Sequence, residues 1–389
     1  MAKMQLTPKL YQKKVLEKIK DDLVPNNNRA PFVIEFDPTT VCDLACPGCI
    51  SGDLLNQKNP LDRGFSKEKI KEIIADIIKQ KVSAVILIGG GEPLAHPSTI
   101  ELIKNLGESN IQIGLTTNGT LMHKYNDIIA KYVSWTRVSV DAASDLMFKN
   151  LRPTKLGVSK FNIVIENMKN LAKIKTGILG YSFLIRTKKD GLIENPAGSN
   201  IGIINHTNIY EIYDAAKLAK DIGCDYFEVK PSYDDFHQLV THDEKDMLVA
   251  STQIEMAKKL ENQNFRILES VMLEASLKGE KLGNQKKTYT KCRSAELRTL
   301  ITPSGCYVCP YFRGENSKKI GDLRFESLEE MWNGDKRKKV MKELNPSKDC
   351  ENLHCIRNET NIEVEKIIDF IKSKKKIDPQ ILPKTDYFI

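Results

Sequence analysis

Three cysteines, Cys42, Cys46 and Cys49, lie within eight positions in the segment TTVCDLACPGCISG, residues 39–52. Cysteine thiolates are soft ligands that bind zinc or iron. A structural zinc ion takes four ligands, usually from two separated pairs, so a group of three fits it poorly. A redox-active pair of Cys46 and Cys49 would leave Cys42 without a role. Three thiolates can instead bind three irons of a 4Fe–4S cluster, which leaves the fourth iron open to a substrate or cofactor.

A second group of cysteines follows residue 290, and Cys224 stands alone between the two groups. The members of the second group are Cys292, Cys306, Cys309, Cys350 and Cys355. Disulfide frameworks are typical of short secreted chains, whereas clustered cysteines in a longer cytoplasmic chain indicate metal. A four-thiolate zinc site is one possibility for this group. Cys224 precedes a β-rich run and is interpreted as a buried structural cysteine, with a hydrogen-atom donor as the alternative.

The 389-residue chain has an ordinary globular composition, with 41% hydrophobic and 28% charged residues. No apolar run approaches the roughly 20 residues that span a bilayer. Residues 1–24 lack the apolar core of a signal peptide and are expected to form an amphipathic helix. We therefore predict a cytoplasmic protein with no membrane partner. The formal net charge is +8, but no basic stripe alternates with aromatic residues, so no nucleic-acid partner is expected.

Six β-rich runs alternate with amphipathic helical patterns between residue 32 and about residue 231. The runs are PFVIEF (31–36), SAVILIG (83–89), IQIGLTT (111–117), TRVSVDA (136–142), YSFLIR (181–186) and YFEVKP (226–231). Repeated strand–helix units imply parallel strands joined by right-handed crossovers. The predicted fold class is α/β, with a partial or open barrel of six units rather than a closed eightfold one.

Glycine-rich and polar motifs follow several of these runs. In GGGEP, residues 89–93, Gly90 and Gly91 let the backbone approach a ligand, and Glu92 can accept hydrogen bonds from an ammonium group. The later runs are followed or ended by polar side chains, namely Asn118, Ser139, Asp141 and Arg186. All these positions share the carboxyl ends of predicted parallel strands, where α/β proteins build their sites.

The C-x3-C-x2-C segment after the first run resembles the signature of radical S-adenosylmethionine (SAM) enzymes, and the resemblance extends over residues 32–231. In that family the open iron is chelated by the amino and carboxylate groups of SAM. An electron from the cluster cleaves the C5′–S bond, and the resulting 5′-deoxyadenosyl radical takes a hydrogen atom from the substrate. The resemblance implies that Cys42, Cys46 and Cys49 hold this 4Fe–4S cluster. It also implies an electron donor of the flavodoxin or ferredoxin type.

The resemblance places the SAM contacts in the motifs that follow the strands. The implied residues are Gly90, Gly91, Glu92, Pro93, Asn118, Ser139, Asp141 and Arg186. Glu92 is assigned to the amino group of SAM, Arg186 to its carboxylate, and Ser139 and Asp141 to the ribose or nearby atoms. Arg152, in the segment NLRPTKLG, is expected to have a structural role at a helix entry.

The second cysteine group resembles the SPASM or twitch module of the same superfamily, which carries auxiliary 4Fe–4S clusters. KCRSAELRTLITPSGCYVCPYF (291–312) and GDLRFESLEEMWNGD (321–335) carry the resemblance. Five cysteines are too few for the two clusters of a full SPASM module, so one auxiliary cluster is expected, as in the twitch form. Its implied ligands are Cys292, Cys309, Cys350 and Cys355. The spacing from Gly305 to Cys309 is one residue shorter than usual, so Cys306 is an alternative ligand.

The pattern divides the chain into five predicted segments. They are a helical extension (1–31), a radical SAM partial barrel (32–240), a helical connector (241–290), a small α+β twitch-like module with the auxiliary cluster (291–360), and a C-terminal helix and tail (361–389). The polar segment 186–208 is a candidate lid or substrate loop. His206 and His237 lie near loop positions but are expected to be incidental.

Twitch-bearing relatives include dehydrogenases of aminocyclitols or sugars and a nucleotide cyclase, whereas full SPASM relatives modify peptides or mature sulfatases. The segment before the first strand also looks too short for the leader-binding module of many peptide maturases. The prediction is therefore a radical SAM oxidoreductase acting on a small polar molecule, such as a sugar, cyclitol or nucleotide-linked sugar, with the auxiliary cluster as electron acceptor. A peptide or protein maturase, a redox-neutral sugar epimerase or decarboxylase, and a non-catalytic iron–sulfur or zinc protein are the alternatives.

Overall fold

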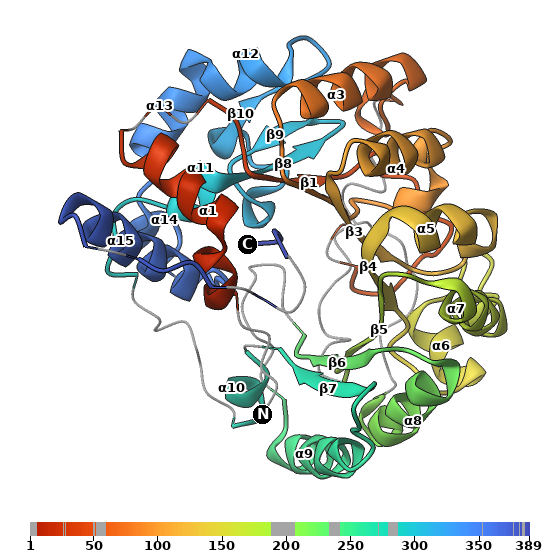
Figure 1. The fold of residues 1–389 in the computed structure, drawn as a ribbon. Coiled ribbons are helices and arrows are strands. Elements are labelled where there is room, and N and C mark those ends of the chain that lie inside the picture. The colour runs from red at the N-terminus through yellow and green to blue at the C-terminus, as the bar shows by residue number, and fades with distance from the viewer. Residues whose placement is uncertain are drawn as a thin grey trace.

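One ten-stranded sheet runs through the described part of the chain, in the order β10-β9-β8-β1-β2-β3-β4-β5-β6-β7 (Figure 1). The structure is a computed structural model. It describes residues 6–389 with gaps at 26, 28, 50, 52–59, 188–206, 233–241, 271, 279–286, 352, 376, 381 and 383–385. The segment 188–206, most of the predicted lid, thus lies outside the described residues, as do His206 and His237.

The first seven strands pair in chain order, each parallel to the next. They are β1 (Val33–Phe36), β2 (Ala84–Leu87), β3 (Gln112–Thr117), β4 (Val133–Ser139), β5 (Ile178–Leu184), β6 (Tyr226–Lys230) and β7 (Arg266–Glu269). Their carboxyl ends therefore lie along one edge of the sheet. Any side chain that follows one of these strands is brought to that edge.

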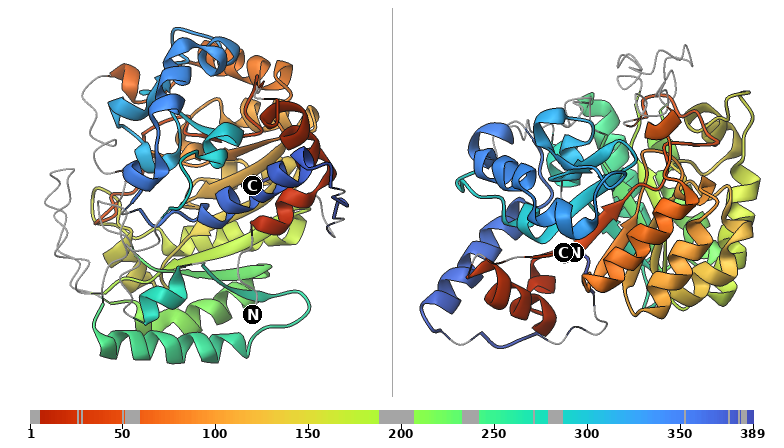
Figure 2. Two further views of the ribbon diagram at one scale, coloured as in Figure 1. Left: turned by 90° about the vertical axis from the view of Figure 1, so that its left-hand side faces the viewer. Right: turned by 90° about the horizontal axis from the view of Figure 1, so that it is seen from above.

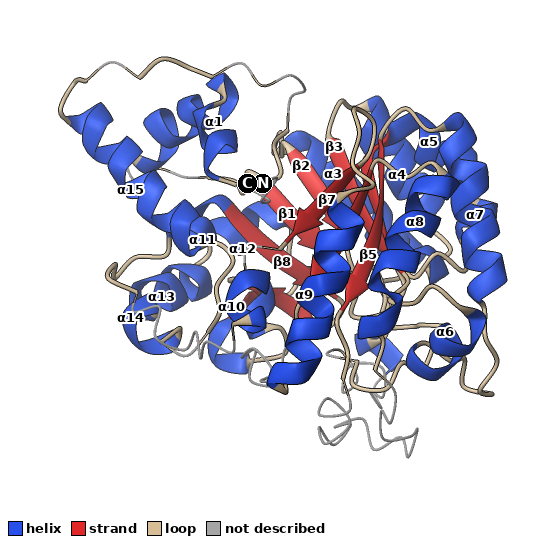
Figure 3. Cartoon of the chain, turned by 90° about the horizontal axis from the view of Figure 1, so that it is seen from below, coloured by secondary structure: helices blue, strands red, loops and turns tan. Residues whose placement is uncertain are grey.

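Helices cover the outer face of the curled sheet (Figures 1 and 3). They are α3 (Lys67–Lys79), α4 (Thr99–Glu108), α5 (Asn126–Tyr132), α6 (Asp145–Leu151), α7 (Phe161–Ile174), α8 (Ile212–Ile222) and α9 (Glu244–Lys258). In α3, the Ser66 hydroxyl caps the helix by accepting a hydrogen bond from the Lys69 amide at 3.1 Å. The buried residues of α3, Ile70, Ile73, Ile74 and Ile77, recur at helical spacing and face the sheet.

The last three strands extend the sheet beyond β1. β8 (Arg298–Thr302) pairs parallel with β1, and β9 (Gly305–Tyr307) and β10 (Lys319–Gly321) continue antiparallel. The helix α11 (Arg293–Leu297) directly precedes β8. Three short helices follow β10, namely α12 (Leu328–Asn333), α13 (Asp335–Glu343) and α14 (Pro346–Asp349). Ser327 and Glu330 form a reciprocal capping box at the start of α12.

The two ends of the chain pack together in a separate hydrophobic cluster. This cluster contains Leu10 from the turn before α1 (Lys13–Lys18), Val15 from α1 itself and Ile19 from the turn after it. They share it with Val364 and Ile367 of α15 (Asn358–Lys372). Figure 2 shows α1 and α15 side by side, on the opposite side of the sheet from the outer helices. The C-terminal residues reach into the opening of the curled sheet (Figure 1), where the Phe388 ring packs edge-on against Trp135 at 5.4 Å.

The predicted α/β partial barrel is confirmed, and the six expected strands correspond to β1–β6. Two features differ from the expectation. The connector 241–290, predicted to be helical, also supplies the short strand β7 between α9 and α10 (Leu273–Leu277). The predicted α+β module that begins near residue 291 joins the same sheet, because β8 pairs with the edge of β1 that β2 does not cover. None of the described helices is both long and apolar enough to cross a membrane.

Candidate functional site: two groups of thiols on one sheet

The first cysteine group lies on the loop that leaves the carboxyl end of β1. Cys42, Cys46 and Cys49 are each half-buried. Burial raises the pKa of Cys46 to about 11, with the Arg152 charge acting against this and the Cys49 charge adding to it. Burial also raises the pKa of Cys42, and the charge of Cys46 raises it further. The pKa of Cys42 and that of Cys46 are thus both raised by a neighbouring thiolate, and a cation such as iron would balance the negative charges.

Contacts from distant parts of the chain hold this loop in place. The Ala45 amide donates to the Pro153 carbonyl at 2.7 Å, and Leu44 forms a β-bridge with Thr154. The Arg186 guanidinium donates to the Pro47 carbonyl at 2.8 Å. Gly48 has a φ of 62°, and a Cβ there would lie 2.6 Å from Arg186 Nη2. In the structure Arg186 therefore supports the cysteine loop, and its assignment to the SAM carboxylate stays a prediction.

Asn118, which follows β3, is attached to the same loop. Its side-chain amide donates to Asp43 Oδ1 at 2.8 Å and lies 3.7 Å from Cys42 Sγ. The Thr120 hydroxyl donates to the other oxygen of Asp43 at 2.6 Å. The two residues hold the Asp43 carboxylate from both sides, so the backbone of the cysteine loop is anchored next to Cys42.

The GGGEP segment after β2 lies directly against the cysteine loop. A Cβ on Gly91 would lie 2.4 Å from the Thr40 carbonyl carbon and from the Val41 oxygen, so only glycine allows this approach. The Glu92 amide donates to the Val41 carbonyl at 2.8 Å. The Gly90 amide donates to Asp37, the residue that follows β1, and Pro93 begins the short turn that comes next.

The Glu92 carboxylate is buried and surrounded by donors. It accepts hydrogen bonds from the Thr117 hydroxyl at 2.7 Å, the Asn118 amide at 2.7 Å and the Leu94 amide at 3.1 Å. Burial raises its pKa from 4.5 to about 7, although these donors act in the opposite direction. Glu92 is therefore a buried acid that changes its charge near neutral pH, beside the cysteine loop.

The raised pKa of Glu92 predicts a pH-dependent term in stability. Between pH 4.5 and 7 the folded chain retains a proton on Glu92 that the unfolded chain has released. This stabilisation is complete below pH 4.5 and is lost as the pH rises through 7. We expect the unfolding free energy of the wild type, minus that of Glu92→Gln, to fall by about 2 kcal/mol from pH 5 to pH 8. Urea unfolding of both cluster-free proteins at the two pH values measures this; a difference that does not change with pH contradicts it.

Asp141 and Arg152 form a buried ion pair at the carboxyl end of β4. Arg152 Nη2 lies 2.7 Å from Asp141 Oδ2, and the Leu184 amide donates to Asp141 Oδ1 at 2.8 Å. Asp141 has a φ of 61°, an uncommon conformation for a residue other than glycine. Ser139 lies half-buried two residues earlier, in register with Ser182 of β5.

Arg152 is predicted to have a structural role at a helix entry, and the structure places it directly after α6. Its Nη1 lies 4.0 Å from Cys46 Sγ, so its charge faces the cysteine loop. The sequence offered one signal for this, since Arg152 comes soon after a strand that ends in a site residue. The structure thus brings the cysteine loop, Glu92, Asn118 and Asp141 to one edge of the sheet.

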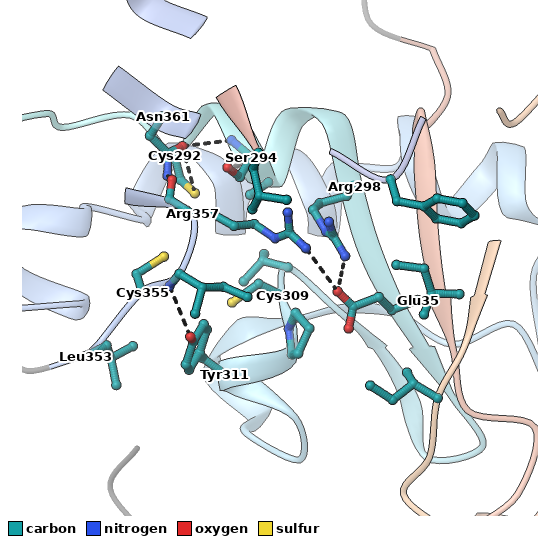
Figure 4. Close-up of a pocket in the computed structure, with 18 of the residues that line it drawn as sticks. Glu35, Cys292, Ser294, Arg298, Cys309, Tyr311, Leu353, Cys355, Arg357 and Asn361 are labelled. Carbon is teal, nitrogen blue, oxygen red and sulfur yellow. Dashed lines mark hydrogen bonds and ion pairs between the residues drawn. The ribbon is translucent and has the colours of Figure 1, made fainter. Parts of the chain in front are cut away.

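Four cysteines of the second group line one cavity of about 520 Å³. They are Cys292 at the start of α11, Cys309 after β9, Cys350 at the end of α14 and Cys355 before α15. Figure 4 shows three of them, Cys292, Cys309 and Cys355, around the cavity. Burial raises the pKa of Cys309 well above its ordinary value, and the charges of the other three raise it further. The four thiols therefore lie within electrostatic reach of one another.

Cys306 and Cys224 lie apart from this cavity. Cys306 is fully buried on β9, and the groups near its thiol are Asp322, Glu326 and Lys319, with no other cysteine among them. Cys224 is buried at the start of β6, beside Asp225 and Lys175. Among the described residues, no three His, Cys, Asp or Glu side chains converge closely enough to hold a single metal ion. The irons of a cubane cluster, by contrast, each take a different thiolate.

Buried charges form one wall of the cavity and were not anticipated from the sequence. Glu35, on β1, forms an ion pair with Arg298 of β8, and Arg357 Nη2 lies 3.8 Å from the same carboxylate oxygen (Figure 4). Nearby, Arg313 donates to Asp37 at 2.8 Å. Burial raises the pKa of Asp37 to about 6, while Arg313 acts against this shift. These two ion pairs tie β1 to the segment that carries the second thiol group.

Comparisons with known proteins find one matching family and several similar proteins. Residues 36–195 match the Radical SAM superfamily. Mycofactocin maturase MftC of Mycobacterium tuberculosis is 25% identical over 143 residues, which are 37% of this chain and 35% of that protein. GTP 3′,8-cyclase of Alkaliphilus metalliredigens is 30% identical over 199 residues, 50% of this chain and 54% of that protein. The chain thus spans from about a third to about half of the length of these relatives.

Solved structures share the fold at low sequence identity. SuiB of Streptococcus suis bound to the precursor peptide SuiA has a TM-score of 0.57 at 16% identity, covering 94% of this chain and 80% of that chain. The protein anSMEcpe with bound AdoMet, which is SAM, has a TM-score of 0.55 at 14% identity, covering 89% of this chain and 100% of that chain. Residues 36–195 are thus similar to the Radical SAM superfamily, in a chain that shares the partial-barrel fold of SuiB and anSMEcpe.

Proposed function

We propose that this chain is a radical SAM enzyme whose SAM-binding 4Fe–4S cluster is held by Cys42, Cys46 and Cys49. The observation that carries the proposal is that the three thiols lie on one loop, where the Cys46 charge acts on Cys42 and the Cys49 charge acts on Cys46. The other six cysteines lie elsewhere in the described structure. Three thiolates leave one iron of a cubane cluster for an outside ligand. The loop also lies against GGGEP, where Glu92 provides a buried carboxylate for the amino group of SAM.

When bound, the cluster would supply the single electron that breaks the C5′–S bond of SAM. The side chains around it have positioning tasks. Asn118 anchors the backbone beside Cys42, and Arg152 places a positive charge beside Cys46 that favours its thiolate form. Glu92 in its ionised form would accept hydrogen bonds from the amino group of SAM. Ser139 and Asp141, at the end of β4, would contact the ribose of SAM or nearby atoms. The backbone can approach SAM closely at Gly90, Gly91 and Pro93. Arg186 holds the cysteine loop in the shape that receives the carboxylate of SAM.

The second group, Cys292, Cys309, Cys350 and Cys355, is proposed to hold one auxiliary 4Fe–4S cluster. Four thiols around one cavity are the ligand set that a fully protein-bound cubane cluster needs. Such a cluster can accept the second electron when a substrate radical is oxidised to a product with a new double bond, such as a ketone. The proposed reaction is therefore a two-electron oxidation of a small polar substrate, a sugar, cyclitol or nucleotide-linked sugar. A donor of the flavodoxin or ferredoxin type would reduce the SAM-binding cluster.

A peptide or protein substrate is the second candidate. It is favoured by the similarity to the maturase MftC over 143 residues and by the fold shared with SuiB, which was solved with its precursor peptide. The two candidates require the same two clusters and the same SAM chemistry. They differ in the molecule that loses the hydrogen atom, so a short precursor-peptide gene beside this one would favour the peptide, and glycosyltransferase genes would favour the sugar.

Anaerobic reconstitution tests the proposal directly. We expect about eight irons per chain, the content of two 4Fe–4S clusters, and formation of 5′-deoxyadenosine from SAM when dithionite is the reductant. Four irons together with one zinc would contradict the auxiliary cluster but not the SAM-binding one. Eight irons with no 5′-deoxyadenosine would contradict the proposed radical SAM activity.

A further inference from the structure

The cavity lined by the four thiols also contains buried hydrogen-bond donors that lack partners. Among the described residues, nothing accepts from Arg357 Nη1 or Arg298 Nε, and nothing bonds to Ser294 Oγ. All three residues line the cavity. A buried donor without a partner loses its hydrogen bonds to water and gains none in return, so several on one wall require an explanation. The simplest one is an acceptor that binds inside the cavity.

Two of these donors flank the cysteines along the chain. Arg357 comes two residues after Cys355, and its Nη2 is 3.8 Å from Glu35, which leaves Nη1 for another acceptor. Ser294 comes two residues after Cys292, and its amide donates to Asn361 Oδ1 at 2.8 Å. That bond fixes the backbone of Ser294 while its hydroxyl remains without a partner. Figure 4 shows Arg357, Ser294 and the thiols of Cys292 and Cys355 on the walls of the same cavity.

We propose that Arg357 Nη1 and Ser294 Oγ donate hydrogen bonds to the sulfur atoms of the auxiliary cluster and thereby raise its reduction potential. The inference rests on the auxiliary cluster of the proposed function. Reduction adds a negative charge that is shared with the sulfurs, and hydrogen bonds and a nearby cation stabilise that charge. Arg357 contributes both effects and Ser294 only a neutral hydrogen bond, so Arg357 has the larger effect. Both are positioning residues that make the cluster a better electron acceptor.

The test uses full-length chain in which Cys42, Cys46 and Cys49 are replaced by alanine, so that only the auxiliary cluster, with about four irons, can form. An anaerobic redox titration with dithionite, followed by electron paramagnetic resonance, gives its midpoint potential. At the parent's midpoint, Arg357→Gln should lower the ratio of reduced to oxidised cluster about tenfold, a shift of 59 mV for one electron. Ser294→Ala should lower the ratio about threefold, since a neutral donor is roughly half as strong as a charged one.

Arg293→Gln is the matched control. Arg293 is next to Cys292 in the chain, but its guanidinium is engaged by Glu296 at 2.7 Å and Glu365 at 2.8 Å, outside the cavity lining. We expect its midpoint to equal that of the parent. Loss of iron from Arg357→Gln would leave Ser294→Ala to decide, because the Ser294 hydroxyl has no bond to lose in the described structure.

The outcomes separate this inference from the function on which it rests. Four irons with midpoints that neither variant shifts would overturn the inference and leave the auxiliary cluster in place. An equal shift in the Arg293→Gln control would also overturn it, because the effect would then be one of net charge alone. Absence of iron from the triple-alanine parent would overturn both the auxiliary cluster and the inference.

Discussion

Replacing Cys46 by alanine should reduce 5′-deoxyadenosine formation to the background of the enzyme-free reaction. Cys46 is the middle of the three thiols, and both Arg152 and the Cys49 charge act on it. Without its thiolate, the cysteine loop offers only two ligands, too few to hold a cubane cluster. Iron should therefore fall from about eight to about four per chain, because the other four thiols are untouched. Liquid chromatography of the nucleoside product and an iron assay measure the two effects.

Two control variants make this result specific. Cys224→Ala, which changes a buried cysteine at the start of β6, should keep about eight irons and full SAM cleavage. Cys355→Ala should lose the auxiliary iron but still cleave SAM, although the reaction on substrate should stop. If Cys46→Ala kept all its iron, the assignment of the first cluster to this loop would be wrong.

Replacing Glu35 by alanine should destabilise the chain by about 3–5 kcal/mol. Glu35 is buried and is the partner of Arg298, which is 2% exposed, and of Arg357. Removing the carboxylate leaves two guanidinium groups in the interior without their counter-charge. The cost arises from the unpaired buried charges rather than from the worth of the pair itself. Urea unfolding of the cluster-free proteins, followed by circular dichroism, gives the difference.

An exposed ion pair provides the contrast. Glu329 pairs with Lys79 at 3.1 Å, but their side chains are 53% and 70% exposed. Water and salt already compensate these charges, so Glu329→Ala should leave the unfolding midpoint unchanged. Equal losses in Glu35→Ala and Glu329→Ala would show that burial of the Glu35 network is not what stabilises it.

The strands, and the position of the site at one edge of the sheet, could be predicted because both depend on local patterns. Short apolar, β-branched runs separated by helical periods specify parallel strands, and the carboxyl ends of such strands must share an edge. Glu92, Asn118 and Asp141 follow three different strands and meet there for that reason. The short strand β7 was missed because its four residues, RILE, carry too little pattern to distinguish them from a connector.

Long-range contacts of charged residues could not be predicted in the same way. Glu35 and Arg298 are far apart in the sequence, and a single acidic residue inside an apolar run gives no sign of its partner. The sequence predicts only a helix-entry role for Arg152, because its contact with Cys46 joins residues that are far apart in the chain. The spacing also left Cys306 and Cys309 open, whereas in the structure Cys309 lies at the cavity and Cys306 lies buried on β9 away from it.

β1 is hydrogen-bonded along both edges, to β2 on one side and to β8 on the other. A chain shortened at residue 290 would lose β8. The free edge of β1 would then present an unpaired row of amide and carbonyl groups, with which strands of other chains can pair. The shortened chain would also lose Arg313, and the buried Asp37 carboxylate next to Gly90 would then lack the positive charge of its ion pair. The two parts of the chain are thus not independent. A segment engineered to replace residues 291–389 has to supply its own strand in place of β8 and its own cation in place of Arg313.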